Sequence, residues 1–214
     1  MERGLVRLKI FITGGSSGVG QSCAQLLGEH HDVTAPARAE FDLSDFNAID
    51  RLDLSSYDIV INCAGANAGA YLGWHNNSWS NQVDQINVNF TAGLLLAKQY
   101  TQQRKQGQFI YISSTNIEDP IAYNIFYTAA KAALKYSLDC IKQEFPMIVF
   151  TEICPGKIRS NMLQQNYQGT KTPEEIKAMY AKGTNLSPID IAIQVQHAIK
   201  YKLNQITIVP HENT

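Results

Sequence analysis

Two side chains spaced one helical turn apart offer proton-transfer chemistry. Tyr127 and Lys131 are separated by four positions in an alanine-rich stretch, so on a helix they share one face, with Cβ atoms about 5–6 Å apart. A free tyrosine has a pKa of about 10, but a neighbouring ammonium stabilises the phenolate and lowers that pKa. The pair therefore predicts an acid–base centre. The alternative is a solvated pair on an amphipathic helix.

A glycine-rich loop offers a place for a phosphate group. Residues 13–20 read Thr-Gly-Gly-Ser-Ser-Gly-Val-Gly, directly after a strand-like run and before a helix-like run. Glycines let the backbone approach a pyrophosphate, and the free N–H groups at a helix start attract its charge. An ordinary glycine-rich turn is the alternative. The predicted contacts to a dinucleotide are Gly14, Ser16, Ser17, Gly18, Val19 and Gly20.

The elements that must position these residues alternate between strand-like and helix-like runs. Strands are predicted at 8–13, 33–37, 58–63, 109–113, 148–153 and 206–209, and helices at about 18–28, 79–104 and 124–144. This alternation is typical of a parallel α/β sheet with helices on both faces. We therefore expect one doubly wound, Rossmann-like domain over residues 1–214, with a sheet of about six or seven strands.

Two segments depart from the regular alternation. Only four steps separate Arg38 from Asp42, whereas a crossover between parallel strands needs roughly a dozen residues, so the helix after the second strand is predicted to be missing. Later, Thr172-Pro173 and Ser187-Pro188 each precede acidic residues and are typical helix starts. They predict a substrate-side insertion at about 156–186 that contains a short helix.

The composition argues against several classes of protein. The chain is 44% hydrophobic and 17% charged with a net charge of -1, so it has no basic excess for nucleic acid or an anionic membrane. The apolar stretch 5–12 is interrupted by Arg7 and Lys9, so it is neither a signal peptide nor a spanning segment. Without metal-ligand spacing, the four cysteines are interpreted as reduced core thiols. We expect a cytoplasmic protein without a metal site.

In order along nearly the whole chain, these motifs resemble those of the short-chain dehydrogenase/reductase family. The spacing Gly-x-x-x-Gly-x-Gly, the Asn-Cys-Ala-Gly at 62–65 and the Tyr-x-x-x-Lys at 127–131 are similar to family motifs. The Pro-Gly-x-x-x-Ser at 155–160 is similar too, with Ser160 in place of the family's Thr. The resemblance implies that a nicotinamide dinucleotide also contacts Asn62, Ala64, Gly65, Tyr127, Lys131, Pro155, Gly156, Ile158 and Ser160.

The resemblance also assigns catalytic roles. Tyr127 would transfer the proton, Ser114 would position the substrate oxygen, and Lys131 would also hold the nicotinamide ribose. Asn89 would help to hold a water that links the lysine to solvent. Ser113 is one register away and in a strand points to the opposite face, so Ser114 is preferred. Read without the family, Ser114 is a strand-end turn residue and Asn89 a polar helix residue with a local hydrogen bond.

The segment after the second predicted strand bears on the choice of cofactor. It carries no acid where NAD-selective members have one, and Arg38 is placed to bind a 2′-phosphate, so NADP(H) is favoured over NAD(H). A solvated arginine is the alternative. Asp42-Leu43 resembles the pair that contacts adenine in the family.

The substrate side is less specific. Segment 66–79, with Tyr71, Trp74, His75 and Trp79, and the insertion, with Met162, Met179 and Tyr180, are candidate pocket walls or local core. We expect His75 to be a surface or packed residue. Lys157 and Arg159 either attract an acidic substrate or face solvent, and we expect solvent.

The resulting hypothesis is an NADP(H)-dependent oxidoreductase that interconverts a carbonyl and an alcohol of a small molecule. Family resemblance implies a homodimer or homotetramer built on the helices at 79–104 and 124–144. A non-catalytic NADP-binding sensor or scaffold and an epimerase or dehydratase of the extended relatives are the alternatives. C=C reduction is disfavoured, because related enoyl reductases have a longer Tyr-to-Lys interval.

Overall fold

A parallel sheet of six strands forms the centre of the computed structural model, which describes residues 6–68, 72, 74–167, 170–181 and 185–209. Its order is β2-β1-β3-β4-β5-β6. The strands are β1 (Lys9–Thr13), β2 (Asp32–Thr34), β3 (Ile59–Asn62), β4 (Gly107–Ile112), β5 (Ile148–Pro155) and β6 (Gln205–Ile208). The order reverses between β1 and β3, and doubly wound folds bind ligands at such a reversal. The predicted Rossmann-like α/β fold is confirmed.

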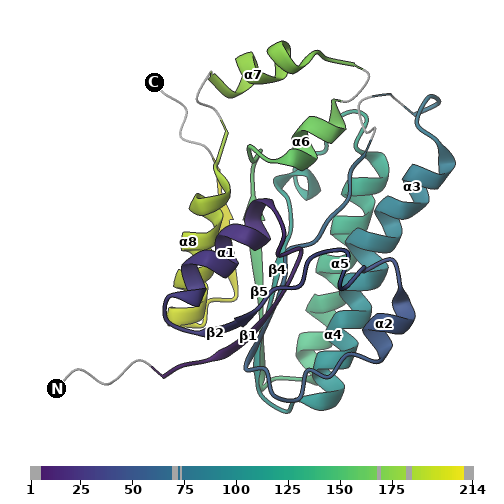
Figure 1. The fold of residues 1–214 in the computed structure, drawn as a ribbon. Helices are drawn as coiled ribbons and strands as arrows, with labels where there is room; N and C mark the ends of the chain where they lie inside the picture. The colour runs from purple at the N-terminus through teal and green to yellow at the C-terminus, as the bar shows by residue number, and fades with distance from the viewer. Residues whose placement is uncertain (1–5, 69–71, 73, 168–169, 182–184, 210–214) are drawn as a thin grey trace.

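Helices cover both faces of this sheet (Figure 1). They are α1 (Gly18–Gly28), α2 (Phe46–Asp50), α3 (Trp79–Ile86), α4 (Ala92–Gln103), α5 (Ile125–Glu144), α6 (Asn161–Asn166), α7 (Pro173–Ala181) and α8 (Pro188–Tyr201). Alternate residues of β1 face opposite sides. Ile10 and Ile12 pack with α1 and α8, whereas Phe11 packs with α2, α4 and α5. Figure 1 shows α6 and α7 beyond the carboxyl ends of the strands.

The long helix predicted over 79–104 is not a single regular helix. α3 ends at Ile86, residues Asn87–Thr91 form one π-helical turn, and α4 begins at Ala92. A π-helical turn accommodates one extra residue, and such turns often occur at functional sites. The prediction of an uninterrupted helix is therefore wrong at this position, where Asn89 lies.

The segment after β2 confirms the missing helix, although the strand is shorter than predicted. β2 ends at Thr34 instead of residue 37, and residues 38–42 contain no helix. The chain turns here because the N–H groups of Glu40 and Phe41 both donate to the Ala37 carbonyl. The five-residue helix α2 then follows, with the Asp45 carboxylate accepting from the N–H groups of its first turn. This side of the sheet therefore ends at β2.

The two predicted helix caps in the C-terminal third are present. Thr172 and Glu175 hydrogen-bond reciprocally at the start of α7, at 3.2 and 2.7 Å. Ser187 and Asp190 form the same capping box at α8. The insertion contains α6 as well as the predicted short helix. Leu163, Tyr167 and Ile176 form a small apolar cluster of their own in this insertion.

The prediction that all four cysteines are core thiols is wrong for one of them. Cys23 and Cys154 are buried and Cys63 is partly buried, but Cys140 is exposed on α5. Its apolar neighbours in sequence do not bury it, because successive residues of a helix point in different directions.

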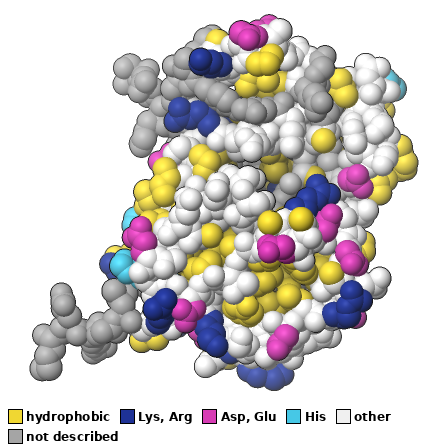
Figure 2. Space-filling view, in the orientation of Figure 1, with side chains coloured by type: hydrophobic (Ala, Val, Ile, Leu, Met, Phe, Trp, Pro, Cys, Tyr) yellow, Lys and Arg dark blue, Asp and Glu magenta, His cyan; other side chains and the backbone are white. Residues whose placement is uncertain are grey.

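The surface carries charges of both signs. Figure 2 shows acidic and basic side chains interspersed on the face drawn, with no single basic patch there. Among the helices in the described part of the chain, none combines the length and the apolar character needed to cross a membrane.

Candidate active site

The carboxyl ends of β1 and β3 are joined by a buried polar contact. Thr13 Oγ1 donates to Asn62 Oδ1 at 2.8 Å and accepts from the N–H of Ala64 at 3.2 Å. The Asn62 amide nitrogen also lies so close to Gly93 on α4 that a Cβ there would be 2.8 Å away. The Asn62 side chain therefore links the ends of β1 and β3 and packs against α4. Sequence reasoning did not assign Thr13 or Gly93 to the site, because both act only through this packing.

The glycine loop after β1 has the backbone that close approach to a ligand requires. Gly14 and Gly18 have φ angles of 71° and 56°, in the left-handed region that favours glycine. A Cβ on Gly15 would overlap the Ala35 carbonyl oxygen just beyond β2. Ser17 is the N-cap residue of α1, but its side chain makes no capping hydrogen bond. The first N–H groups of α1 are thus not capped by this serine, and the loop fits an anionic pyrophosphate.

Ser114 and Tyr127 meet at the carboxyl end of β4. The Ser114 side chain is buried beside the Tyr127 hydroxyl, whose pKa it lowers, and Ser114 Oγ accepts from the N–H of Asn116 at 3.2 Å. Ser113 Oγ is buried and has no hydrogen-bond partner among the described residues. The structure therefore brings the preferred serine, and not its neighbour, to the tyrosine.

Lys131 lies one turn after Tyr127 and is almost fully buried. Its Nζ donates to the Ile112 carbonyl at 2.8 Å and lies 5.7 Å from the centroid of the Tyr127 ring. Burial lowers the pKa of Lys131 to about 8, and Cys63 opposes this shift. Burial raises the pKa of Tyr127 to about 12, with Ser114 opposing it. The expected lowering of the tyrosine pKa is therefore not found, because desolvation of the phenol outweighs the effect of Ser114, and Lys131 is not among the groups that shift this pKa.

Asn89 holds the loop that follows β3. From the π-helical turn, its Nδ2 donates to the carbonyls of Ala66 and Gln85 at 2.6 and 2.9 Å, and its Oδ1 accepts from the Ala66 N–H at 3.1 Å. A Cβ on Gly65 would be 3.0 Å from Asn89 Oδ1 and 3.8 Å from Lys131 Nζ. The two predicted catalytic residues therefore flank Gly65, whose missing side chain leaves the space between them.

The predicted Pro-Gly segment lies at the carboxyl end of β5, next to β6. β5 ends at Pro155, and the Gly156 N–H donates to the Ile208 carbonyl at 2.8 Å. Ile158 forms a parallel bridge with Leu186. Ser160 lies near the glycine loop, since a Cβ added to Gly18 would be 4.0 Å from the Cβ of Ser160. This contact brings two of the predicted cofactor segments together.

The adenine-side residues differ in their surroundings. Arg38 Nε lies 3.2 Å from Asp42 Oδ2, and both side chains are exposed. A hydrogen bond from the Ser44 N–H, more than Arg38, lowers the pKa of Asp42. Leu43 packs in the core with Phe11, so its predicted contact with the cofactor would have to come from its backbone.

The candidate walls on the substrate side are placed in part. Trp74 and Trp79 are exposed and both contact Phe126, in a stacked and an edge-on pair at 5.8 and 5.7 Å. Phe126, the neighbour of Tyr127, was not predicted from the sequence as a residue of this wall. His75 is exposed, as expected. Tyr71 and the side chains of Met179 and Tyr180 lie outside the described residues. Met162 Cε would be 3.1 Å from a Cβ on Gly65.

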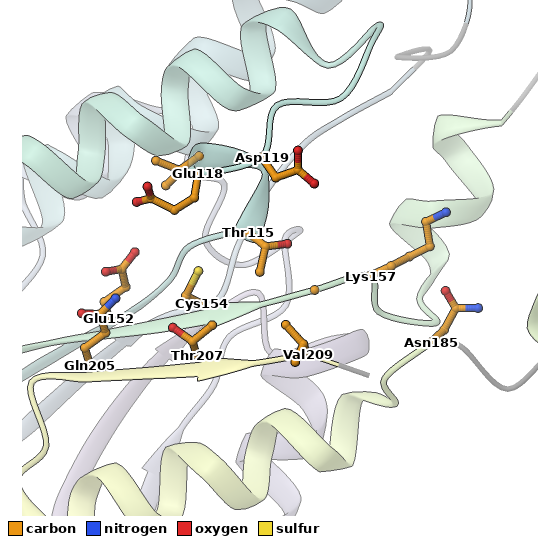
Figure 3. A pocket seen from close by; sticks show the side chains of 12 residues that line it. Thr115, Glu118, Asp119, Glu152, Cys154, Lys157, Asn185, Gln205, Thr207 and Val209 are labelled. Atoms are coloured by element: carbon orange, nitrogen blue, oxygen red, sulfur yellow. The ribbon is translucent and has the colours of Figure 1, made fainter. Parts of the chain in front are cut away.

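A cavity of about 560 Å³ lies beside this site, between the segment that follows Ser114 and the strands β5 and β6 (Figure 3). Its lining includes three acids, Glu118, Asp119 and Glu152, and one base, Lys157. Glu152 is buried and paired with Lys135 at 2.7 Å. Lys157 is exposed, in agreement with the expectation for this residue.

Comparisons with known proteins agree with this geometry. A sequence profile described as short chain dehydrogenase matches residues 40–171. An uncharacterized oxidoreductase of Mycobacterium tuberculosis is 27% identical over 198 residues, which cover 76% of this chain and 78% of the relative. The 3-oxoacyl-[acyl-carrier-protein] reductase MabA of Mycobacterium bovis is 26% identical over 179 residues, with coverage of 73% and 72%.

The fold comparison extends over the whole doubly wound sheet. The crystal structure of a small-chain dehydrogenase in complex with NADPH superposes with a TM-score of 0.79 at 23% identity, covering 95% of this chain and 97% of that one. At this identity, the likeness concerns the fold. The profile match covers more than half of the sequence and includes Asn89, Ser114, Tyr127 and Lys131. The chain therefore belongs to the short chain dehydrogenase family of oxidoreductases.

Proposed function

We propose that the protein interconverts a carbonyl and an alcohol with NADP(H), and that Tyr127 transfers the proton. The observation that carries this proposal is the position of the buried Ser114 side chain beside the Tyr127 hydroxyl, whose pKa it lowers, with buried Lys131 one turn away. Two adjacent hydroxyls can bind one substrate oxygen together, since each can donate and accept. The remaining residues of the proposed site surround this pair.

The cofactor loops fit the dinucleotide that the family uses. The backbone of Gly14 and of residues 16–20 would hold the pyrophosphate at the start of α1. Gly65 and the Pro-Gly segment would flank the nicotinamide, and Lys131 would hold its ribose. The bound nicotinamide supplies or accepts the hydride, and the protein's residues supply orientation and the proton.

The proton needed for carbonyl reduction is present on Tyr127. With a pKa of about 12, the phenol is protonated at neutral pH, as a tyrosine with an ordinary pKa would be, so it can donate that proton. Ser114 would orient the carbonyl oxygen toward that proton. Alcohol oxidation needs the phenolate, which the Lys131 ammonium would stabilise once a bound cofactor reorganises the site.

Lys131 and Asn89 have further hydrogen-bonding groups that could form a proton relay from Tyr127 to solvent. The Lys131 ammonium has three N–H groups, of which one binds Ile112. Asn89 Oδ1 has two lone pairs, of which one accepts from Ala66. We propose that the remaining groups hold a water in the space left by Gly65, where the two side chains come closest.

We propose NADP(H) over NAD(H) because of Arg38. Its guanidinium is exposed near the end of β2, beside the segment that contacts Gly15. Arginine suits a phosphate through paired hydrogen bonds. The structural neighbour in complex with NADPH supports this preference. In the free protein, Asp42 pairs with Arg38, and a 2′-phosphate would compete with that carboxylate.

The assembly that we propose is a homo-oligomer formed through the outer faces of α4 and α5. Tyr136 and Ile125 are 59% and 49% exposed on α5, which supports a contact there. The single six-stranded sheet formed by the described strands supports a single domain. Light scattering of the purified protein tests the oligomer, and Tyr136→Lys is expected to weaken it.

Oxidation of NADPH in the presence of ketones, aldehydes and a 3-oxoacyl thioester tests the function. The thioester belongs in the panel because a relative is named as a 3-oxoacyl reductase. We expect turnover of at least one carbonyl and a loss of about 10²- to 10⁴-fold in Tyr127→Phe. Tyr136→Phe, on the exposed face of the same helix, is the control. Equal turnover in Tyr127→Phe contradicts the mechanism, and tight NADPH binding without turnover across the panel indicates a sensor.

A further inference from the structure

Three buried asparagines connect segments that are far apart in the sequence. Asn67 lies in the loop after β3, Asn124 directly precedes α5, and Asn166 is the last residue of α6. Their exposed fractions are 3%, 3% and 7%. Buried carboxamides are costly unless they are hydrogen-bonded, so their mutual contacts determine whether these three segments stay together.

The amide group of Asn67 is the centre of the network. Its Nδ2 donates to Asn124 Oδ1 at 3.0 Å. Asn166, in the amide orientation that its neighbours require, donates to the backbone carbonyls of Asn67 and Met162 at 2.5 and 2.9 Å. The Asn166 oxygen accepts from Asn67 Nδ2 at 3.2 Å. Both N–H groups of the Asn67 amide are therefore used, one toward α5 and one toward α6.

Each end of this network lies next to a residue of the proposed site. Asn124 precedes Tyr127 by three positions, about one helical turn. Asn67 follows Ala66, which Asn89 holds by both its N–H and its carbonyl. A substitution at Asn67 would therefore change the position of the start of α5 and of the loop beside Lys131.

Apolar contacts also hold the α6 end of the network. The apolar cluster of the insertion, with Leu163 at its centre, is separate from the two clusters that pack on the sheet. Met162 supplies an apolar contact to Gly65. Asn166 adds hydrogen bonds one turn later on the same helix, so these two residues together hold α6 over the end of the sheet.

We propose that Asn67, Asn124 and Asn166 are positioning residues that hold α6 against the end of α5 carrying Tyr127. The network thereby fixes the space in which a substrate meets Tyr127. None of the three touches the reacting groups, so they act through the placement of α5 and α6. The catalytic part of this inference rests on the proposed function, whereas the structural part does not.

Asn166→Ala tests the inference, with Asn161→Ala as the control. Asn161 is exposed at the start of the same helix, so both variants lose one asparagine from α6. Asn166→Ala removes all three hydrogen bonds of the Asn166 amide. We expect it to raise the KM of the best carbonyl substrate by about tenfold or more, since one lost buried hydrogen bond already has an effect of that size. The kcat and the Kd for NADPH should change much less, because the cofactor loops and Tyr127 remain. Hydrogen exchange of the α6 amides should become about tenfold faster.

Two results with the single variant Asn166→Ala would overturn the inference. One is an α6 exchange rate in Asn166→Ala equal to that in Asn161→Ala, and the other is a KM equal to that of the control. If the wild-type protein turns over no carbonyl, the proposed function fails, and the exchange rates still decide whether the network holds α6. Asn67→Ala combined with Asn166→Ala should cost less than the sum of the two single changes, since the bond from Asn67 Nδ2 to the Asn166 oxygen is lost in both. Fully additive effects would also contradict the network.

Discussion

The hydroxyl of Ser114 lies beside the hydroxyl of Tyr127, thirteen positions away in sequence, and it opposes the rise in the tyrosine pKa that burial causes. Ser113 Oγ is buried without a hydrogen-bond partner among the described residues. Of the two serines at the end of β4, only Ser114 therefore interacts with Tyr127.

Ser114→Ala is expected to lower kcat/KM for carbonyl reduction by roughly 10²-fold, the loss typical of one positioned donor to a reacting oxygen. Ser114→Thr keeps the hydroxyl and should retain most activity. Ser113→Ala is the matched control in the same strand end and should leave kcat within about threefold of wild type. Steady-state kinetics distinguish the three, and equal losses in the Ser113 and Ser114 alanine variants would argue against the assigned role.

Lys131→Met is expected to stabilise the cofactor-free protein at pH 7. The pKa of Lys131 falls from 10.5 to about 8 on folding, so below pH 8 the folded state retains a charge that burial disfavours. Between pH 8 and about 10.5, Lys131 is protonated in the unfolded state more often than in the folded state, so the stability of the wild type rises with pH. The advantage of the variant, up to about 3 kcal/mol, should therefore shrink across that range.

Urea unfolding at pH 7 and pH 10 measures this difference. Lys98→Met, at an exposed position of α4, is the control and should show no such change. A Lys131→Met variant less stable than wild type at pH 7 would mean that the bond to Ile112 outweighs the cost of burial.

Gly15→Ala is expected to destabilise the protein by about 1–3 kcal/mol, the usual cost of forcing an extra group into a packed site. The added Cβ would overlap the backbone carbonyl of Ala35, so the glycine loop must move. Affinity for NADPH should fall with it. Gly28→Ala, in the same α1 region, meets nothing within 4 Å and should be neutral or stabilising by up to about 1 kcal/mol. Thermal unfolding and NADPH titration compare the two.

Arg38→Ala is expected to raise the Kd for NADPH about tenfold and to leave the Kd for NADH nearly unchanged. Asp42→Asn should tighten NADPH binding, because it removes the carboxylate that pairs with Arg38 in the free protein. Arg51→Ala, an exposed arginine beyond α2, is the control. Equal loss of NADH and NADPH affinity in Arg38→Ala would contradict recognition of a 2′-phosphate.

The sequence predicted the sheet well because its strands are short apolar runs bounded by polar residues. All six strands lie where those runs are, and the missing helix before Asp42 followed from chain length alone. The end of β2 was placed too late, since Ala35 continues the apolar run but packs on Gly15 instead of pairing with a neighbouring strand.

That Tyr127, Lys131 and Ser114 lie together was also predicted from the sequence, through their spacing and the family resemblance. The pKa of Tyr127 was not, because it depends on how far each group is buried, which spacing does not report. Phe126 and the three linked asparagines were missed for a related reason. Their partners lie in other segments, and no local pattern connects Asn67 to Asn166.

The π-helical turn at Asn87–Thr91 shifts the phase between α3 and α4. An α-helix advances by about 100° per residue, so this one additional residue rotates everything before it relative to everything after it. Removing a single residue from the turn would restore a continuous helix, but the face of α3 that packs on α5 would then point elsewhere. The register of this helix is thus set by the number of residues as much as by their type, and a one-residue deletion would detach Asn89 from Ala66.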